Sequence, residues 1–155
     1  MPFSALDVRL GDDYITVGPV AFIPRGKAVS DLIFILGAPS RSMALEYSVL
    51  HIYDHLGLRF WAKNGVVSEF QIVLETEDHY ALPSQAFVGL LQYRGQVLII
   101  PVPGSLFSER EIRDFVQDTD PLQYGVVTYD AKLPRLTYSA TMSKRTGNLQ
   151  YLSIV

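Results

Sequence analysis

The chain repeats part of itself, and this repeat restricts its fold more than any other feature of the sequence. The residues Gly, Val, Phe and Pro at positions 18, 20, 22 and 24 recur as Gly, Val, Ile and Pro at 95, 97, 99 and 101, a displacement of 77. Self-similarity at a fixed offset indicates a duplicated structural unit. We therefore predict a single domain, residues 1–155, with internal repeats at about 7–75 and 87–155 joined by residues 76–86.

The displacement changes along the chain. It is 77 where Tyr47 corresponds to Tyr124, 76 where Tyr53-Asp54 corresponds to Tyr129-Asp130, and 82 where Phe70 and Ile72 correspond to Leu152 and Ile154. Such drift is expected when insertions collect in the loops of two diverged copies. The two repeats should therefore share their order of elements more closely than their loop lengths.

Each repeat predicts a hairpin followed by a helix. The hairpins are expected at 14–23 and 87–100, and both stop at a proline, which cannot continue a central strand. The helices are expected at 28–36 and about 108–117. The first should end at Gly37-Ala38-Pro39, because glycine and proline are typical of the residues after a helix.

A meander of three strands should follow each helix. In the first repeat the strands are expected at about 47–53, 58–63 and 66–74, with Asn64-Gly65 as a hairpin turn. The alternation in VVSEFQIVL predicts one irregularity, at Ser68-Glu69. In the second repeat the strands are expected at about 122–130, 135–142 and 148–155. The predicted class is α+β: two tandem β-β-α-β-β-β repeats forming antiparallel sheet, with one helix per repeat.

Composition narrows the functional classes. With 155 residues, 48% of them hydrophobic, the chain can bury a sizeable core. It has no cysteine, which excludes disulfides, thiolate nucleophiles and cysteine-based zinc sites. Its net charge of −3 argues against nucleic acid as a partner. The start has no signal-peptide pattern and no apolar stretch is long enough to span a bilayer, so we expect a cytoplasmic protein without a membrane segment.

The stretch YSVLHIYDHLGLRFW places His51, Asp54 and His55 close together in the sequence. A metal or acid–base site of this spacing needs its side chains on one face of a helix. Apolar residues alternate around the stretch and Gly57 follows, which indicates a strand that ends in a turn, where these side chains diverge. We therefore predict that Asp54 fixes the turn, and we predict no metal, cofactor or catalytic residue here.

The connector between the repeats, ETEDHYALPSQA, contains a second group of candidates. Glu75, Glu77 and Asp78 stand beside His79, and acid–base work by Glu75, Glu77 and His79 remains an alternative interpretation. A run of charges at the end of a strand is more often a solvated connector. No nucleophile motif of the Gly-x-Ser-x-Gly type accompanies it.

The predicted second helix, SEREIRDFVQDTD, carries most of the negative charge of its repeat. Glu109, Glu111, Asp114 and Asp118 should lie on its exposed side, away from the apolar stripe of Ile112, Phe115 and Val116. Acidic surfaces steer and orient basic partners. The partner-binding residues that we predict are therefore Glu75, Glu77, Asp78, Glu109, Glu111, Asp114 and Asp118.

Residues 34–74 carry a family resemblance. Leu36-Gly37, Pro39-Ser40-Arg41, Tyr53-Asp54, Leu56-Gly57-Leu58 and Gly65-Val66-Val67 form a pattern of helix end, strand-turn and hairpin strand. This pattern resembles a bacterial family of small duplicated α+β domains encoded near polymorphic and contact-delivered toxins. The resemblance implies an immunity protein: a cytosolic inhibitor that binds a cognate toxin. It brings no catalytic residues.

Three functional hypotheses therefore stand after the sequence. The first is an immunity protein that masks the active site of a toxin, which we expect to be basic. The second is a small hydrolase that uses the region of His51, Asp54 and His55, either with a metal or by acid–base chemistry. The third is an adaptor that works through an exposed sheet edge, such as the C-terminal strand LQYLSIV. The oligomeric state, monomer or dimer, stays open.

Overall fold

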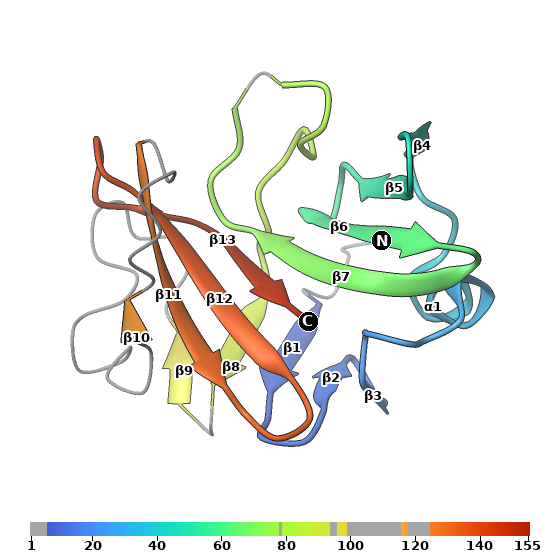
Figure 1. The fold of residues 1–155 in the computed structure, drawn as a ribbon, viewed down its shortest axis with the longest axis horizontal. Coiled ribbons are helices and arrows are strands. Elements are labelled where there is room, and N and C mark those ends of the chain that lie inside the picture. Colours follow the sequence, from blue (N-terminus) through green and yellow to red (C-terminus); the bar gives the residue numbers. More distant parts are fainter. Residues whose placement is uncertain (1–5, 78, 94–95, 99–115, 118–124) are drawn as a thin grey trace.

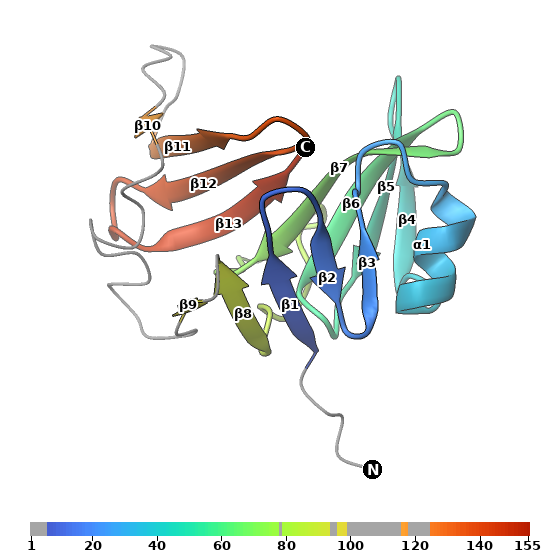
Figure 2. The same cartoon turned by 90° about the horizontal axis from the view of Figure 1, so that it is seen from below.

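The structure is a computed structural model that describes residues 6–77, 79–93, 96–98, 116–117 and 125–155. Two sheets face each other, and one helix lies at one end of them (Figures 1 and 2). The smaller sheet has five strands in the order β3-β2-β1-β8-β9. They are β1 Asp7–Leu10, β2 Ile15–Val17, β3 Val20–Phe22, β8 Leu90–Tyr93 and β9 Gln96–Leu98.

The larger sheet has eight strands in the order β10-β11-β12-β13-β7-β6-β5-β4. The bounds of its first four strands in the chain are β4 Arg41–Ala44, β5 Val49–Tyr53, β6 Leu58–Lys63 and β7 Val66–Val73. The others are β10 Val116–Gln117, β11 Val126–Lys132, β12 Thr137–Ser143 and β13 Leu149–Ile154. Every described pairing in this sheet is antiparallel.

The core lies between the two sheets and follows the alternation of the strands. The smaller sheet contributes Val8, Leu10, Ile15, Val17 and Leu91. The larger sheet contributes residues such as Phe60, Phe70, Ile72, Leu152 and Ile154. Since neighbouring residues in a strand point to opposite faces, the other residues of the larger sheet form an outer face. This outer face holds most of the polar side chains discussed below.

The helix α1, Val29–Leu36, closes one end of the sandwich beside β3 and β4 (Figure 2). Leu32 is its fully buried residue, and Phe34 stands 91% exposed on the other side. The helix ends at Gly37, whose φ of 84° is in the left-handed region that favours glycine. The hydroxyl of Tyr53 donates a 2.8 Å hydrogen bond to the carbonyl of Gly37, which ties the end of the helix to β5.

The predicted α+β class is wrong, because the described part of the chain is mostly strand and contains one helix. Residues 108–115 of the predicted second helix lie outside the described residues. Its last two residues form β10 instead, pairing with Asp130 and Tyr129 of β11. The pairing of Val116 and Gln117 with β11 is a tertiary contact that an apolar pattern at helical spacing cannot register.

Other elements of the prediction are confirmed. Both hairpins form at the predicted places, as β2–β3 and β8–β9, and α1 agrees with the first predicted helix. Asn64 and Gly65 both have positive φ, 55° and 77°, as a type I′ hairpin turn requires. The irregularity predicted at Ser68-Glu69 is also present, since Trp61 pairs with Glu69 and Ala62 with Val67. This leaves Ser68 as the extra residue of a bulge.

Strands β1 and β4 were not predicted. The first pairs in parallel with β8, so the smaller sheet is mixed rather than antiparallel. The second, β4, pairs with β5 at the edge of the larger sheet. Both are short, and neither shows the long alternation from which a strand is inferred.

The strand order of the larger sheet is symmetric about the pair β7–β13, with three strands outward on each side. Across this pair Phe70 faces Ile154 and Ile72 faces Leu152. Two copies related by a two-fold axis would pair in this way, because Phe70 and Ile72 correspond to Leu152 and Ile154 at the displacement of 82. The duplication stays a prediction, which superposition of the two halves would test.

The adaptor hypothesis needs an exposed sheet edge, and the C-terminal strand that we named as an example is not at an edge. Strand β13 lies inside the larger sheet, hydrogen-bonded to β12 on one side and to β7 on the other. A partner therefore finds no free edge there. Among the described residues, no helix is long and apolar enough to cross a membrane.

Candidate functional site

The connector between β7 and β8 is a fixed part of the fold. We call residues 76–86 the strap; it stands above β5 and β6 at the top of Figure 1. Three consecutive carbonyl groups of the strap, those of Tyr80, Ala81 and Leu82, accept hydrogen bonds from arginine side chains of the larger sheet. Hydrogen bonds to three successive main-chain carbonyls restrict the conformation of residues 80–82.

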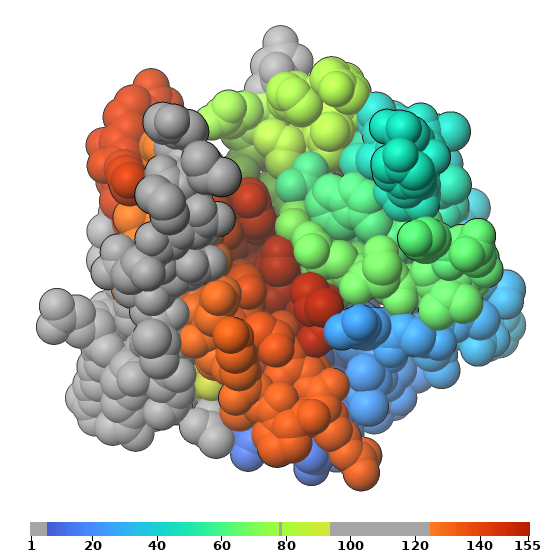
Figure 3. Space-filling model, viewed as in Figure 1, coloured from blue at the N-terminus to red at the C-terminus, as the bar shows by residue number. Residues whose placement is uncertain are grey.

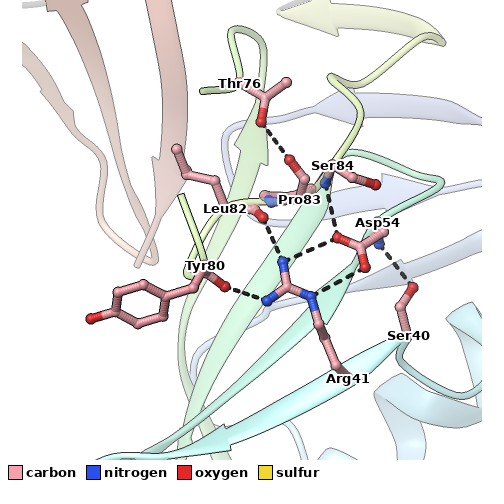
Figure 4. A network of polar contacts seen from close by, with 8 residues as sticks. All are labelled: Ser40, Arg41, Asp54, Thr76, Tyr80, Leu82, Pro83 and Ser84. Carbon is pink, nitrogen blue, oxygen red and sulfur yellow. Dashed lines mark hydrogen bonds and ion pairs between the residues drawn. The ribbon is translucent and has the colours of Figure 1, made fainter. Parts of the chain in front are cut away.

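Arg41, the first residue of β4, makes two of these contacts (Figure 4). Its Nη1 donates to the carbonyl of Tyr80, and its Nη2 donates to the carbonyl of Leu82 at 2.7 Å. Its Nε and Nη2 also donate to the two carboxylate oxygens of Asp54, each at 3.2 Å. This bidentate ion pair orients the planar guanidinium group toward the strap.

Arg59 of β6 makes the third contact and is 8% exposed. Its Nη1 donates to the carbonyl of Ala81 at 2.6 Å, and its Nε donates to the Oε1 of Gln71 at 2.8 Å. The guanidinium lies over the rings of Trp61 and Tyr151, 4.8 and 5.6 Å from their centres. Burial lowers the pKa of Arg59, whereas nearby Tyr151 and Glu69 act to raise it. The charge is therefore held by aromatic faces and hydrogen bonds beneath the strap.

Asp54 connects the strap to the turn after β5. Besides the ion pair with Arg41, its carboxylate accepts a 2.8 Å hydrogen bond from the amide of Ser84, and its own amide donates to the hydroxyl of Ser40. Asp54 was predicted to fix its own turn through nearby amides; it does bind an amide, but that amide belongs to the strap. The hydrogen bond from Arg41 is the main cause that lowers the pKa of Asp54.

The other members of the predicted His51, Asp54 and His55 group have different surroundings. The ring of His51 lies 4.8 Å from that of Phe60 and its Nδ1 is 2.8 Å from the hydroxyl of Ser42. Burial lowers the pKa of His51. His55 is exposed in the turn. In the part of the chain that the structure describes, no three His, Asp or Glu side chains form a group that could hold a metal ion.

A cavity of about 590 Å³ opens between the strap and Arg41. Its lining includes Glu77, His79 and Ser84. The ring of His79 stacks on that of Tyr80 with 4.5 Å between their centres, and its Nδ1 accepts from the amide of Ala81. Within the described residues, no side-chain hydrogen bond or ion pair joins Glu77 to His79. The two groups share a cavity without forming an acid–base pair.

Only some of the predicted partner-binding residues are among the described residues. Glu77 is exposed on the strap, and Glu75 is half-buried just before it, where its amide donates to the carbonyl of Gln150. The remaining predicted residues lie outside the described part of the chain: Asp78, Glu109, Glu111, Asp114 and Asp118.

Acidification should loosen the strap. The folded-state pKa of Asp54 is below its usual value near 3.8, so the ion pair stabilises the protein above that value and is lost as the pH falls through the folded pKa. We expect urea unfolding to show that wild type loses more stability than Asp54→Asn between pH 6 and pH 3. Parallel pH profiles of the two proteins would contradict this assignment.

One family comparison bears on the chain. A family model matches residues 10–99, more than half of its length, and is described as a domain of unknown function, DUF7738. The chain belongs to the DUF7738 family. The match begins in β1, ends after β9, and contains the strap with Arg41, Asp54 and Arg59. No curated protein and no solved structure matches the chain.

Sequence reasoning missed both arginines of this DUF7738 domain as the residues that hold the strap. Arg59 gave a faint signal, since it is a charged residue inside the otherwise apolar run LGLRFW. A buried charge needs partners, so such a residue predicts a polar contact on its face of the sheet. Its partners are main-chain carbonyls, which any sequence provides, and the strap could not be found in this way.

Proposed function

We propose that this protein is a cytoplasmic immunity protein that binds a cognate toxin and masks the active site of that toxin. The contact that carries the proposal is the attachment of the strap by Arg41 and Arg59 through three successive carbonyl groups. The arginine donors hold the main chain of the strap, which leaves exposed side chains such as those of Glu77 and Tyr80 to meet a partner. A recognition loop that is already ordered loses little entropy when it binds.

Tyr80 is the anchor that we propose for this contact. Its ring is 68% exposed and points away from the arginine network (Figure 4), while its carbonyl is held by Arg41. Stacking on His79 further restricts the ring. Exposed tyrosines on rigid supports are enriched among the residues that dominate binding energy at protein interfaces.

The charge of the proposed partner follows from the strap and from the whole chain. Glu77 lies exposed beside Tyr80 and His79, and the chain carries a net charge of −3. Complementary charge speeds association and orients the encounter. We therefore propose a basic toxin, with the strap against its active site.

A hydrolase based on His51, Asp54 and His55 is less favoured by the contacts. The carboxylate of Asp54 already accepts two hydrogen bonds from Arg41 and one from Ser84. His51 contacts Phe60 and Ser42, on a strand position directed at the core side of the sheet. A general base needs a free lone pair within reach of its substrate, and this arrangement gives Asp54 little freedom.

The protein should co-purify with the product of the toxin gene beside its own. Tyr80→Ala should weaken this complex about tenfold or more, because truncating an interface anchor typically costs more than 1 kcal/mol. Titration calorimetry on the purified pair would measure the change. Tyr47→Ala is the matched control, since Tyr47 is a similarly exposed tyrosine, 74%, in the β4–β5 turn.

The binding experiment has two outcomes against the proposal. One is that no neighbouring gene product binds the wild-type protein or is neutralised by it in cells. The other is that Tyr80→Ala and Tyr47→Ala bind as tightly as the wild type, which would remove the strap from the interface.

A further inference from the structure

The two halves of the larger sheet place different residues at corresponding positions of their outer faces. Gln71 and Ser153 pair with each other at the centre of the sheet. One strand outward, Arg59 pairs with Gln71 and Ser139 pairs with Ser153. The next pairs give Ile52 beside Arg59 and Asp130 beside Ser139. By register, therefore, Asp130 occupies the place of Ile52, and Ser139 the place of Arg59.

This register also corrects the sequence correspondence between Tyr53-Asp54 and Tyr129-Asp130. Asp54 follows β5 and belongs to a turn, whereas Asp130 lies within β11. The side chain of Asp130 stands on the outer face, where it accepts a 2.6 Å hydrogen bond from the hydroxyl of Ser139. The two aspartates therefore have different roles.

The strap covers the outer face of the first half. There Arg59 is buried beneath it and donates to the carbonyl of Ala81. The strap is a non-helical segment that is held chiefly through its main-chain groups. It shows, within one molecule, how a segment of chain can bind to the outer face of this sheet.

The outer face of the second half carries hydroxyl groups and one carboxylate. We call it the second outer face; it consists of the half-buried Thr128, Asp130, Ser139 and Tyr151 together with the buried Thr141 and Ser153. The side-chain hydrogen bonds described for it run within the face or to Gln71 and Glu69 of β7. Figure 3 shows the dark-red β13 set back beside the green β6–β7, with the orange atoms of β11–β12 below it in this view.

Asp130 gives the second outer face its charge. It is half-buried, and the one ion pair in the described part of the chain joins Arg41 to Asp54 instead. Lys132 follows on the same side of β11 and is exposed at the end of the strand, and no ion pair between Lys132 and Asp130 is found among the described residues. Among the described residues, the donor to this carboxylate is the hydroxyl of Ser139. A cationic donor would make a stronger, charge-assisted hydrogen bond, as Arg41 does with Asp54.

From this correspondence we infer that the second outer face binds an extended segment of a protein partner that carries arginine or lysine. Asp130 accepts from the cationic side chain of the segment, and the hydroxyl group of the half-buried Ser139 meets its main chain. The half-buried ring of Tyr151 lies beside it as an apolar contact. The inference rests on the proposed function, because it gives the basic toxin a second contact besides the strap.

The experiment uses two probes on the full chain. The first is a capped eight-residue peptide of alternating arginine and threonine, followed by amide chemical shifts in NMR. We expect shifts concentrated in β11, β12 and β13. Asp130→Asn should weaken binding of the peptide about tenfold or more, the value of one charge-assisted hydrogen bond. Asp31→Asn, an exposed acid on α1, is the matched control and should bind like the wild type.

The second probe is the neighbouring toxin, titrated against wild type, Asp130→Asn and Tyr80→Ala. Weaker binding by both variants supports the inference. Toxin binding that Asp130→Asn leaves unchanged, together with no peptide shifts in β11–β13, overturns the inference while the proposed function stands. Peptide shifts in β11–β13 without any toxin binding overturn the proposed function alone. A further outcome is that amide shifts in β11–β13 change with protein concentration before any peptide is added. That result would show that a second copy of the chain binds this face, which also overturns the inference.

Discussion

Replacing Gly57 with alanine is expected to destabilise the protein by more than about 4 kcal/mol, a large part of the roughly 5–15 kcal/mol that stabilises a typical domain. A Cβ at this position would overlap the amide nitrogen of Phe87 and lie 2.5 Å from the carbonyl carbon of Ala86. These are backbone atoms at the point where the strap returns to the sheet. The amide of Val73 donates to the carbonyl of Gly57, and the amide of Phe87 donates to the carbonyl of Val73, each at 2.8 Å. The chain cannot move aside without breaking these bonds.

Gly65→Ala separates the two reasons why Gly57 must be glycine. Both glycines have positive φ, 67° and 77°, so alanine is strained at either position. No atom lies within 4 Å of a Cβ built at Gly65, and this control should lose only about 1 kcal/mol. Urea unfolding followed by circular dichroism gives both values. Equal losses in the two variants would mean that the strap does not pass Gly57 as closely as described.

Local signals in the sequence predicted the local structure well. Asn64-Gly65 predicts its hairpin because few other residues adopt two successive left-handed conformations. Ser68 interrupts the alternation of VVSEFQIVL, and an interrupted alternation is what a bulge produces. Long-range pairing leaves no such trace. The parallel contact of β1 with β8 and the central contact of β7 with β13 join residues about 80 positions apart, and each strand would satisfy its alternation equally well beside another partner.

The candidate site shows the same division. Sequence spacing drew attention to His51, Asp54 and His55, yet the partner of Asp54 is Arg41, which only the folding of β4 against β5 brings near. Glu77 and His79 were weighed as chemical groups, whereas the strap that holds them is fixed through the carbonyls of Tyr80, Ala81 and Leu82. Main-chain acceptors are the same in every residue, so their use cannot be read from residue types.

Phe70→Ala is expected to cost about 3–5 kcal/mol, the usual range for removing a fully buried phenylalanine. Phe70 is 0% exposed and lies where three parts of the molecule meet. It pairs with Phe60 of β6 and with Ile154 of β13, and its ring meets that of Phe22 in the smaller sheet edge to face, 6.4 Å between centres. Differential scanning calorimetry should show one transition, shifted to lower temperature.

The number of transitions in that scan decides whether the two halves are one folding unit. Because Phe70 contacts Ile154 across the central pair, a loss in the first half should also lower the stability of the second, and one cooperative transition should remain. Phe34→Ala is the control, since this phenylalanine is 91% exposed and its loss should change stability by about 0.5 kcal/mol or less. Two separate transitions in Phe70→Ala, with the later one at the wild-type temperature, would mean that residues 87–155 fold without the first half. The outer face that the two halves build together would then not be a single recognition surface.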